Sequence, residues 1–167
     1  MEELIEQVGP FVGILLVLFI FAIGISLIRK FNNSKKKAKA SENWPSVAGL
    51  VTLSQVERSA SSDEDGTSYS YDPHIEYTYN VNGKNYLSKQ VTFGGLSTTG
   101  TAQKSQLTIA RYPVNAPVRV FYNPNNPHEA VLETAFGSGA KGALFGGFLL
   151  VIVALAMAVV LLMELMS

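Results

Sequence analysis

Two histidines, His74 and His128, are the side chains of this sequence best suited to acid–base or metal chemistry. Acidic residues lie near both of them: Asp72 and Glu76 beside His74, and Glu129 beside His128. Imidazole and carboxylate groups bind zinc and other transition metals, and they also serve hydrolases as general acids and bases. Two histidines in separate segments are more often ordinary surface residues. We therefore expect no metal site here, and a His/carboxylate-dependent hydrolase stays an alternative.

Other chemical motifs are missing from the sequence. There is no Cys among the 167 residues, which excludes disulfides, thiolate nucleophiles and thiolate zinc sites. There is no Gly-x-Ser-x-Gly elbow, no Gly-x-x-x-x-Gly-Lys-[Ser/Thr] phosphate loop and no Gly-x-Gly-x-x-Gly motif. The acidic run 63–66 lacks the spacing and the distal Glu of a calcium loop. We expect no catalytic residue and no cofactor, and we expect that the protein is not an enzyme.

Aromatic residues gather around one segment of the chain: Tyr69, Tyr71, Tyr77, Tyr79 and Tyr86. Exposed tyrosines at such spacing form stacking surfaces for bases or sugars in some proteins. Packing in a core and across strands is the more common role, and we favour it here.

Two uncharged apolar runs, 9–28 and 142–163, are each long enough to cross a membrane as a helix. A helix rises 1.5 Å per residue, so about 20 residues cover the roughly 30 Å hydrocarbon core of a bilayer. The acidic N-terminus and the lack of a small-residue cleavage site favour an uncleaved anchor over a signal peptide. Each run begins with a Gly-x-x-x-Gly pattern, which is common by chance in glycine-rich spans: Gly9 with Gly13, and Gly142 with Gly146.

Six basic residues follow the first run before any acidic residue occurs: Arg29, Lys30, Lys35, Lys36, Lys37 and Lys39. Basic residues beside a span stay in the cytoplasm, and Lys141 lies beside the second run. We expect an inner (cell) membrane protein with a cytoplasmic middle domain and both termini outside. Juxtamembrane lysines also attract anionic headgroups. Lys35, Lys36, Lys37 and Lys39 are therefore candidate lipid-headgroup residues, and an anionic-lipid sensor is a second alternative.

The clearest local pattern of the middle segment predicts a β-hairpin. Large apolar residues alternate with polar ones from Ile75 to Val81, and Asn82-Gly83 is the favoured pair for a two-residue type I′ turn. Counting outward from this turn places Tyr79 opposite Tyr86 and Glu76 opposite Lys89. The hairpin should therefore run through 69–93.

Weaker patterns predict the remaining elements. We expect strands at 47–57, 117–122 and 129–133, a mobile loop at 59–68, a Gly/Ser/Thr loop at 94–100, a short Thr-capped helix at 101–111 and a rigid turn at 123–127. In the strand before this turn, alternation predicts that Val118 and Val120 are buried and that Arg119 is exposed. The net charge of the whole chain is zero, and the chain beyond Glu42 is close to neutral, so we expect no nucleic-acid partner.

Several short motifs of the middle segment occur in a fixed order: Trp44, Gly49, Tyr77-x-Tyr79-x-x-x-Gly83, Tyr112-Pro113, and Tyr122-Asn123-Pro124-x-x-Pro127. In this respect 44–133 resembles an uncharacterised bacterial membrane-protein family, domain of unknown function 3592. The resemblance implies a small β-rich module beside a membrane. It implies no activity, catalytic residue or cofactor.

The sequence thus predicts a membrane protein of the α+β class, in which two transmembrane helices flank a small antiparallel β-rich soluble domain with one short helix. The expected segments are an acidic tail 1–8, a transmembrane helix 9–28, a basic linker 29–43, the β-rich domain 44–133, a Gly-rich linker 134–141, a transmembrane helix 142–163 and a tail 164–167. The expected function is that of a non-enzymatic interaction module in a protein–protein or membrane-complex accessory role. The expected partners are the lipid bilayer and a protein partner or homo-oligomer.

Overall fold

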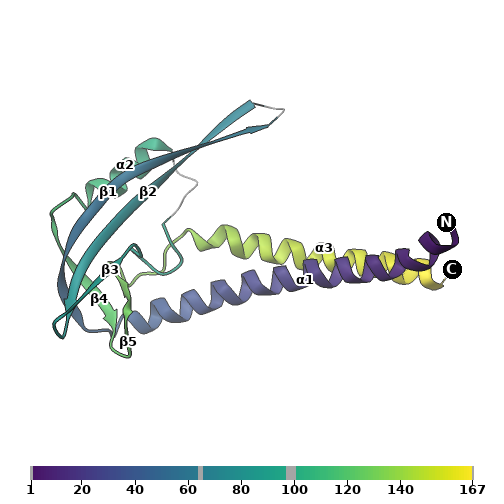
Figure 1. The fold of residues 1–167 in the computed structure, drawn as a ribbon, viewed down its shortest axis with the longest axis horizontal. Helices are drawn as coiled ribbons and strands as arrows, with labels where there is room; N and C mark the ends of the chain where they lie inside the picture. The colour runs from purple at the N-terminus through teal and green to yellow at the C-terminus, as the bar shows by residue number, and fades with distance from the viewer. Residues whose placement is uncertain (1, 64–65, 97–100, 167) are drawn as a thin grey trace. The chain divides into compact units, whose positions relative to one another are not determined.

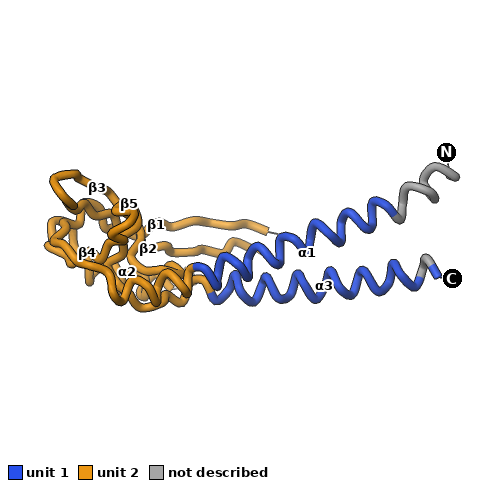
Figure 2. Tube along the Cα trace, turned by 90° about the horizontal axis from the view of Figure 1, so that it is seen from below, with its two compact units in different colours: residues 1–33, 141–167 blue, residues 34–140 orange. Residues whose placement is uncertain are grey.

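The computed structural model describes residues 2–63, 66–96 and 101–166, and the chain divides into two compact units (Figure 2). The helical unit comprises Met1–Asn33 and Lys141–Ser167, and the β-rich unit comprises Ser34–Ala140. The order of the helices and strands matches the predicted fold class. One long apolar helix lies towards each end of the sequence, and a β-rich unit with one short helix lies between them in sequence.

The helical unit is built from most of α1 (Glu2–Ser41) and α3 (Ala140–Met166). Both helices have large apolar residues around most of their circumference, and many of these side chains are exposed, including Phe11, Phe19 and Phe145. A helix that is apolar all round is typical of a membrane span. Within the described residues, Phe11–Ser41 and Ala140–Met163 are long and apolar enough to cross a membrane.

The two helices pack antiparallel in this unit, and their backbones come closest at glycines outside the Gly-x-x-x-Gly patterns. Of the pattern glycines, Gly13 meets the Leu161 side chain, 3.0 Å from an added Cβ atom. A Cβ atom placed on Gly24 would lie 2.9 Å from the carbonyl oxygen of Gly147, and one placed on Gly147 would lie 3.0 Å from that of Gly24. A Cβ atom on Gly142 or Gly146 would meet no atom within 4 Å. Close packing of spans needs small residues where the backbones meet, and here those residues are Gly24 and Gly147.

The prediction of a basic linker at 29–43 is wrong, because α1 continues to Ser41. The last turns belong to the β-rich unit, where Ala38 and Ser41 are buried and Ser41 Oγ donates to the Ala38 carbonyl at 2.7 Å. Ala38 lies in a small apolar cluster with Phe93 and Val131. The lysines at 35–37 and 39 are good helix formers. Ala38 and Ser41, three positions apart on one face of α1, pack this end of the helix against the sheet. The predicted tails 1–8 and 164–167 are also helical where they are described, since α1 begins at Glu2 and α3 ends at Met166.

The β-rich unit is a five-stranded antiparallel sheet in the order β3-β2-β1-β4-β5 (Figure 1). Its strands are β1 (Ser46–Asp63), β2 (Gly66–Val81), β3 (Lys84–Ser88), β4 (Pro117–Asn123) and β5 (Asn126–Val131). Three hairpin-connected strands with the fourth returning beside the first make a Greek key. Helix α2 (Ala102–Ala110) lies in the long connection between β3 and β4.

The two ends of the sheet approach each other and partly close it into a barrel. The segment after β3 meets the segment after β5 in a parallel bridge between Thr92 and Glu133, and the amide of Leu132 donates to the Val91 carbonyl at 2.9 Å. Tyr77 Oη, from the middle of the sheet, lies 2.8 Å from the Gln90 carbonyl and 3.0 Å from that of Ala130. A partly open five-stranded Greek-key barrel is the arrangement of OB-folds.

The predicted hairpin is confirmed in turn, register and burial. Asn82 and Gly83 have φ of 52° and 83°, as a type I′ turn requires. Val81 pairs with Lys84 and Tyr79 with Tyr86. Lys89 forms an ion pair with Glu76 at 2.6 Å, although β3 ends at Ser88 and not near Phe93. The inward side chains of β2 form the core with residues of the neighbouring strands: Ile75, Tyr77, Tyr79, Val81, Val51 and Val120.

The predicted loop at 59–68 is wrong for the residues described. β1 and β2 continue past the other strands as a two-stranded ribbon (Figure 1). We call the seven pairs from Glu57–Asp72 to Asp63–Gly66 the distal ribbon. Every described side chain from 57 to 70 is exposed, so the ribbon forms by backbone pairing and not by burial. Residues 64 and 65, which belong to the acidic run, lie outside the described residues.

Smaller differences concern the second half of the unit. The last strand is β5 at Asn126–Val131 instead of 129–133, because Asn123 pairs directly with Asn126 and shortens the turn. Helix α2 ends before Tyr112 as predicted, but Thr101 at its N-cap makes no side-chain capping bond. Val120 is fully buried, Val118 is partly buried and Arg119 is exposed, which confirms the predicted faces of β4. Part of the predicted loop at 94–100, namely 97–100, lies outside the described residues.

Candidate functional site

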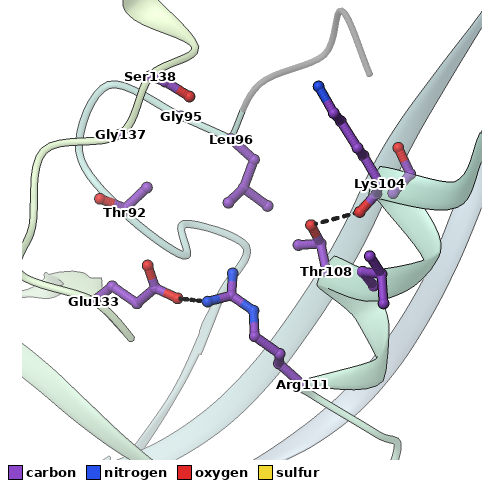
Figure 3. A pocket seen from close by; sticks show the side chains of 11 residues that line it. Thr92, Gly95, Leu96, Lys104, Thr108, Arg111, Glu133, Gly137 and Ser138 are labelled. Carbon is purple, nitrogen blue, oxygen red and sulfur yellow. Dashed lines mark hydrogen bonds and ion pairs between the residues drawn. The ribbon is translucent and has the colours of Figure 1, made fainter. Parts of the chain in front are cut away.

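A cavity of about 440 Å³ lies between α2 and the two segments that follow β3 and β5 (Figure 3). We call it the α2 cavity. Its lining residues come from the segment after β3 (Thr92, Gly95 and Leu96), from the segment after β5 (Glu133, Gly137 and Ser138) and from α2 with its C-cap (Lys104, Ser105, Leu107, Thr108 and Arg111). Volumes of a few hundred Å³ are typical of sites for small molecules.

Two walls of the α2 cavity are held together by backbone contacts between glycine-rich segments. The amide of Gly137 donates to the Phe93 carbonyl at 2.7 Å, and that of Gly139 donates to the Gly95 carbonyl at 3.2 Å. A Cβ atom on Gly137 would lie 2.1 Å from the Gly95 oxygen, so no other residue fits without a shift of the backbone. The sequence suggested only a loop and a linker here, since glycine content does not reveal which segments will meet.

The third wall, α2, is fixed to the base of the ribbon by two serine hydroxyls. Ser105 is buried and donates to the Tyr71 carbonyl at 2.5 Å, while Ser54 donates to the Ile109 carbonyl at 3.3 Å. The first hydrogen bond satisfies a β2 carbonyl on the side of the strand that faces away from β1, and the second satisfies a carbonyl at the end of the helix. The walls of the cavity are thus tied to the core on all three sides.

Arg111, Tyr112 and Glu133 form a charged group at one end of the cavity. Glu133 Oε1 accepts from Tyr112 Oη at 2.5 Å and lies 3.0 Å from Arg111 Nη1. Burial raises the pKa of Tyr112, and its hydrogen bond to the Glu133 carboxylate raises it further. The phenol therefore remains a donor at neutral pH, and it holds Glu133 in place beneath the guanidinium.

Lys104 is the second cation of the cavity. It is exposed, and the described residues give it no ion pair; seven positions separate it from Arg111, which places the two on the same side of α2. In Figure 3 the Lys104 amine points towards one end of the cavity, above Leu96, and the Arg111 guanidinium reaches towards Glu133 at the other end. Sequence analysis did not single out Lys104 or Arg111, because neither belongs to a local motif.

The histidines are given different neighbours by the fold. His74 Nε2 lies 3.7 Å from Glu57 Oε2, whereas the His128 ring packs edge-on against Tyr86 with centroids 4.9 Å apart. Of the acids near them in sequence, Glu76 is paired with Lys89 and Glu129 with Lys37. Among the described residues, no group of three or more His, Asp or Glu side chains is placed to hold a metal ion.

The four candidate lipid-headgroup lysines divide into two pairs. Lys37 forms an ion pair with Glu129, and Lys39 forms one with Glu42 at 2.8 Å. The hydrogen bond to Glu42 raises the pKa of Lys39. Lys35 and Lys36 are exposed and have no ion pair among the described residues, so only these two are free to meet a headgroup.

The residues of the Tyr-Asn-Pro-x-x-Pro motif shape the β4–β5 turn. Asn123 Oδ1 accepts from the Asn125 amide at 3.0 Å, and Asn123 Nδ2 donates to Glu129 at 2.9 Å. Tyr79 Oη donates to the Pro127 carbonyl at 2.6 Å, and Tyr122 packs on the core. Pro124 follows Asn123 in the turn itself. Asn82, Gly83 and this motif thus have the structural role expected of them.

The outer face of β2 and β3 is the face with which OB-fold barrels bind oligonucleotides and oligosaccharides. The tyrosines of this hairpin point the other way: Tyr77 and Tyr79 are buried, and Tyr86 stacks on Tyr79 at 5.6 Å. The outer positions of the described strands carry polar residues and one leucine instead: Thr78, Asn80, Asn85 and Leu87. This face offers no Tyr, Phe or Trp platform for bases.

Comparison with known proteins gives a family and no activity. The model of a protein family described as "Domain of unknown function (DUF3592)" matches residues 47–137. This range contains α2, all of the five strands except Ser46, and every lining residue of the α2 cavity except Ser138. The chain has no match among curated proteins.

Proposed function

Because the chain belongs to the DUF3592 family, whose description assigns no activity, we propose its function from the β-rich unit. We propose that the protein is a non-enzymatic integral membrane protein whose distal ribbon binds another protein. The observation that carries this proposal is the free edge of β1. This edge pairs with β4 at Ser46–Leu50 and bonds to Asn115 and Ala116 at Val51, and beyond Val51 its backbone has no partner on that side among the described residues.

The amides that face outward from this edge follow from the register. Pairs in an antiparallel ladder alternate between hydrogen-bonded and non-hydrogen-bonded kinds. Pro73 has no N–H and lies opposite Val56, so this pair is of the non-hydrogen-bonded kind. By alternation, the amides of Arg58, Ala60 and Ser62 also point away from β2.

An exposed, regular edge of this kind is a template for an added strand. Natural proteins protect such edges with proline, a bulge or charged side chains, above all lysine. Between Val56 and Asp63, β1 has no proline, lysine or bulge, and its charged residues are Glu57, Arg58 and Asp63. The β2 edge is covered at one point, where Ser105 of α2 donates to the Tyr71 carbonyl. We therefore assign the β1 edge as the binding edge, and an extended segment of a second protein as its partner.

Photo-crosslinking in cells that produce the full chain tests this proposal. A photoreactive amino acid at Ser61, on β1, should give a discrete adduct, whereas one at Asn85, exposed on β3, should give none. Ala60→Pro removes one outward amide without breaking the β1–β2 ladder, so it should abolish the Ser61 adduct. Ala60→Val keeps that amide and serves as the matched control.

The adduct also identifies the partner class. A mass equal to twice the chain would make the partner a second copy, and any other mass would make it a different protein. Failure to form an adduct at Ser61, or an adduct unaffected by Ala60→Pro, contradicts the proposal. The hydrolase alternative places function on His74 and His128. Replacing both with alanine separates the two accounts, because the proposed binding role does not use them and predicts that the Ser61 adduct persists.

We propose in addition that the β-rich unit faces the cytoplasm of a bacterial inner membrane. The support is the charge distribution, because the basic residues nearest the spans, Arg29 to Lys39 and Lys141, all lie between them. Since the chain has no Cys, single cysteines are clean reporters. An impermeant maleimide on intact cells should label Ser167→Cys and spare Ser62→Cys. The opposite pattern would place the ribbon outside.

An anionic-lipid role is favoured by one observation, the free state of Lys35 and Lys36. Lysines near a membrane surface contribute about 1 kcal/mol each to binding anionic lipid. Replacing both with glutamine should reduce co-purification of anionic lipid with the full chain. The double variant Lys84→Gln, Lys89→Gln removes the same charge from β3 and its flank, and equal loss of lipid in it would count against this role.

A further inference from the structure

The α2 cavity has the features of a ligand site that the interaction role does not use. Its walls are tied to the core by the hydrogen bonds of Gly137 and Gly139 on one side and of Ser105 on the other. The space between them, about 440 Å³, is larger than a bare ion needs and suits a small organic molecule. Both features are independent of the free β1 edge.

The charges that line the cavity are unequal. It contains two cations, Lys104 and Arg111, and one acid, Glu133. Glu133 is already engaged, since its Oε1 atom meets both Arg111 and Tyr112. One unit of positive charge is therefore uncompensated among the described lining residues.

The guanidinium of Arg111 is positioned for a second partner. Glu133 Oε1 lies 3.0 Å from Arg111 Nη1, and the Arg111 group lies 5.5 Å from the centre of the Tyr112 ring. An arginine has five N–H donors, so most of them remain for a ligand. Lys104 lines the same cavity from about two turns earlier on α2, with its amine towards the opposite end from the Arg111 guanidinium (Figure 3).

We propose that the α2 cavity binds the phosphate of a singly charged phosphodiester between Lys104 and Arg111. An arginine and a lysine on a flexible stem, both lining one cavity, suit a phosphate, the first by its fork of donors and the second as a point charge. A phosphodiester carries the one negative charge that the cavity lacks. Leu96 and Leu107 line the same space, and Leu107 is 64% exposed, so the ligand also has apolar atoms in contact with them.

A phosphodiester of this kind has two sources, a phospholipid headgroup or a free water-soluble ester. Titration calorimetry on the full chain in a non-ionic detergent distinguishes them. The probes are glycerophosphoglycerol, which is soluble, and dihexanoyl phosphatidylglycerol, which has the same headgroup with short acyl chains. Saturable binding of both at equal strength indicates the free ester, and tighter binding of the lipid indicates the headgroup.

Lys104→Gln should weaken binding of either probe about tenfold, because one charge-assisted hydrogen bond is lost. The matched control, Lys84→Gln, removes an exposed lysine from β3 and should leave the affinity unchanged. Unchanged Trp44 fluorescence verifies that each variant keeps its fold. The proposal is overturned if neither probe binds saturably, or if the two variants lose affinity equally.

Discussion

The two halves of strand β2 follow different rules. Between Pro73 and Val81 every second side chain is buried, and Ile75, Tyr77 and Tyr79 form the centre of the core. Between Gly66 and Ser70 all side chains are exposed, yet the strand keeps its pairing with β1 residue by residue. The first half is held by burial on one face. The second is held by its ladder and by exposed side-chain contacts, such as the Arg58 guanidinium 4.1 Å from the centre of the Tyr69 ring.

This difference shows which part of the unit is free to serve a partner. Stability in the barrel half comes from apolar area removed from water, which contributes roughly 25 cal/mol per Å². A two-stranded ribbon without such area is marginally stable in water. Changes in the barrel half should therefore alter the stability of the whole unit, while changes in the distal ribbon should alter only the ribbon.

The largest expected effect is from Ile75→Ala. Ile75 is 2% exposed, and truncation of such a side chain costs about 2–5 kcal/mol because it leaves a cavity. Thr67→Ala, in the distal half of the same strand, should cost less than about 0.5 kcal/mol. The measurement is denaturant unfolding followed by Trp44, the only tryptophan, which lies in the β-rich unit against Phe93. Equal costs would show that the ribbon is part of the core.

The turns at the two ends of β2 sharpen the comparison. Gly83 and Gly66 have φ of 83° and 133°, where a β-branched residue is strained. Gly83→Val should lower the free energy of unfolding by about 1–3 kcal/mol, since it strains the barrel hairpin. Gly66→Val should leave the Trp44 transition in place and only raise hydrogen exchange in the ribbon. A global loss of stability from Gly66→Val would contradict the separation of the two halves.

The barrel half should also have a pH dependence. Burial opposes ionisation of Glu129, but the hydrogen bonds from Lys37 and Asn123 outweigh it and hold its pKa below the ordinary 4.5. A depressed pKa in the folded state contributes stability above that ordinary pKa, and the contribution disappears as pH falls through the lower value. Glu129→Gln should therefore cost stability at pH 7 and progressively less below about pH 4.5.

The cost at pH 7 should be about 1 kcal/mol or less, because the Lys37 side chain is 43% exposed and water screens the pair. Denaturant unfolding of Glu129→Gln and of the unaltered chain at pH 7 and at about pH 3.5 measures it. A difference that grows in acid would have the wrong sign for this account.

The smallest expected effect is a gain within the ribbon. Glu57 and Asp72 lie directly opposite each other, and like charges in such a pair are destabilising. Asp72→Asn removes this repulsion and should slow exchange of the ribbon amides by a factor that corresponds to about 0.5 kcal/mol. Ser70→Asn, two pairs further out, is the neutral control. Faster exchange in Asp72→Asn would show that the carboxylate has a stabilising partner.

The barrel half was accessible from sequence because several signals coincide there. The Asn82-Gly83 turn fixes the register, the alternation fixes the face, and the Tyr79–Tyr86 pair agrees with both. The distal ribbon carries no alternation, because none of its side chains has to be buried, and its Ser, Asp and Gly content is typical of a loop. The ribbon pairs because β1 and β2 are already paired in the barrel and continue in the same register. No local sequence pattern reveals such a continuation.

The end of α1 and the α2 cavity escaped prediction for a different reason. The lysines after the first span indicated topology, and this signal is independent of whether the segment is helical. Ala38 and Ser41 mark a buried face only once the sheet is known to lie against them. Likewise, the cavity arises where Gly95 meets Gly137 and where α2 brings Lys104 and Arg111 beside them. Such tertiary proximity has no signature in a single sequence.

Residue-resolved hydrogen exchange of the purified full chain in detergent tests most directly that the distal ribbon is formed and has a free edge. The account predicts alternation along β1: the amides of Glu57, Ser59 and Ser61 should be protected by β2, and those of Arg58, Ala60 and Ser62 should exchange at rates close to those of an unstructured peptide. Uniformly fast exchange across 57–62 would instead indicate the mobile loop that the sequence suggested. It would remove the edge on which the proposed function rests.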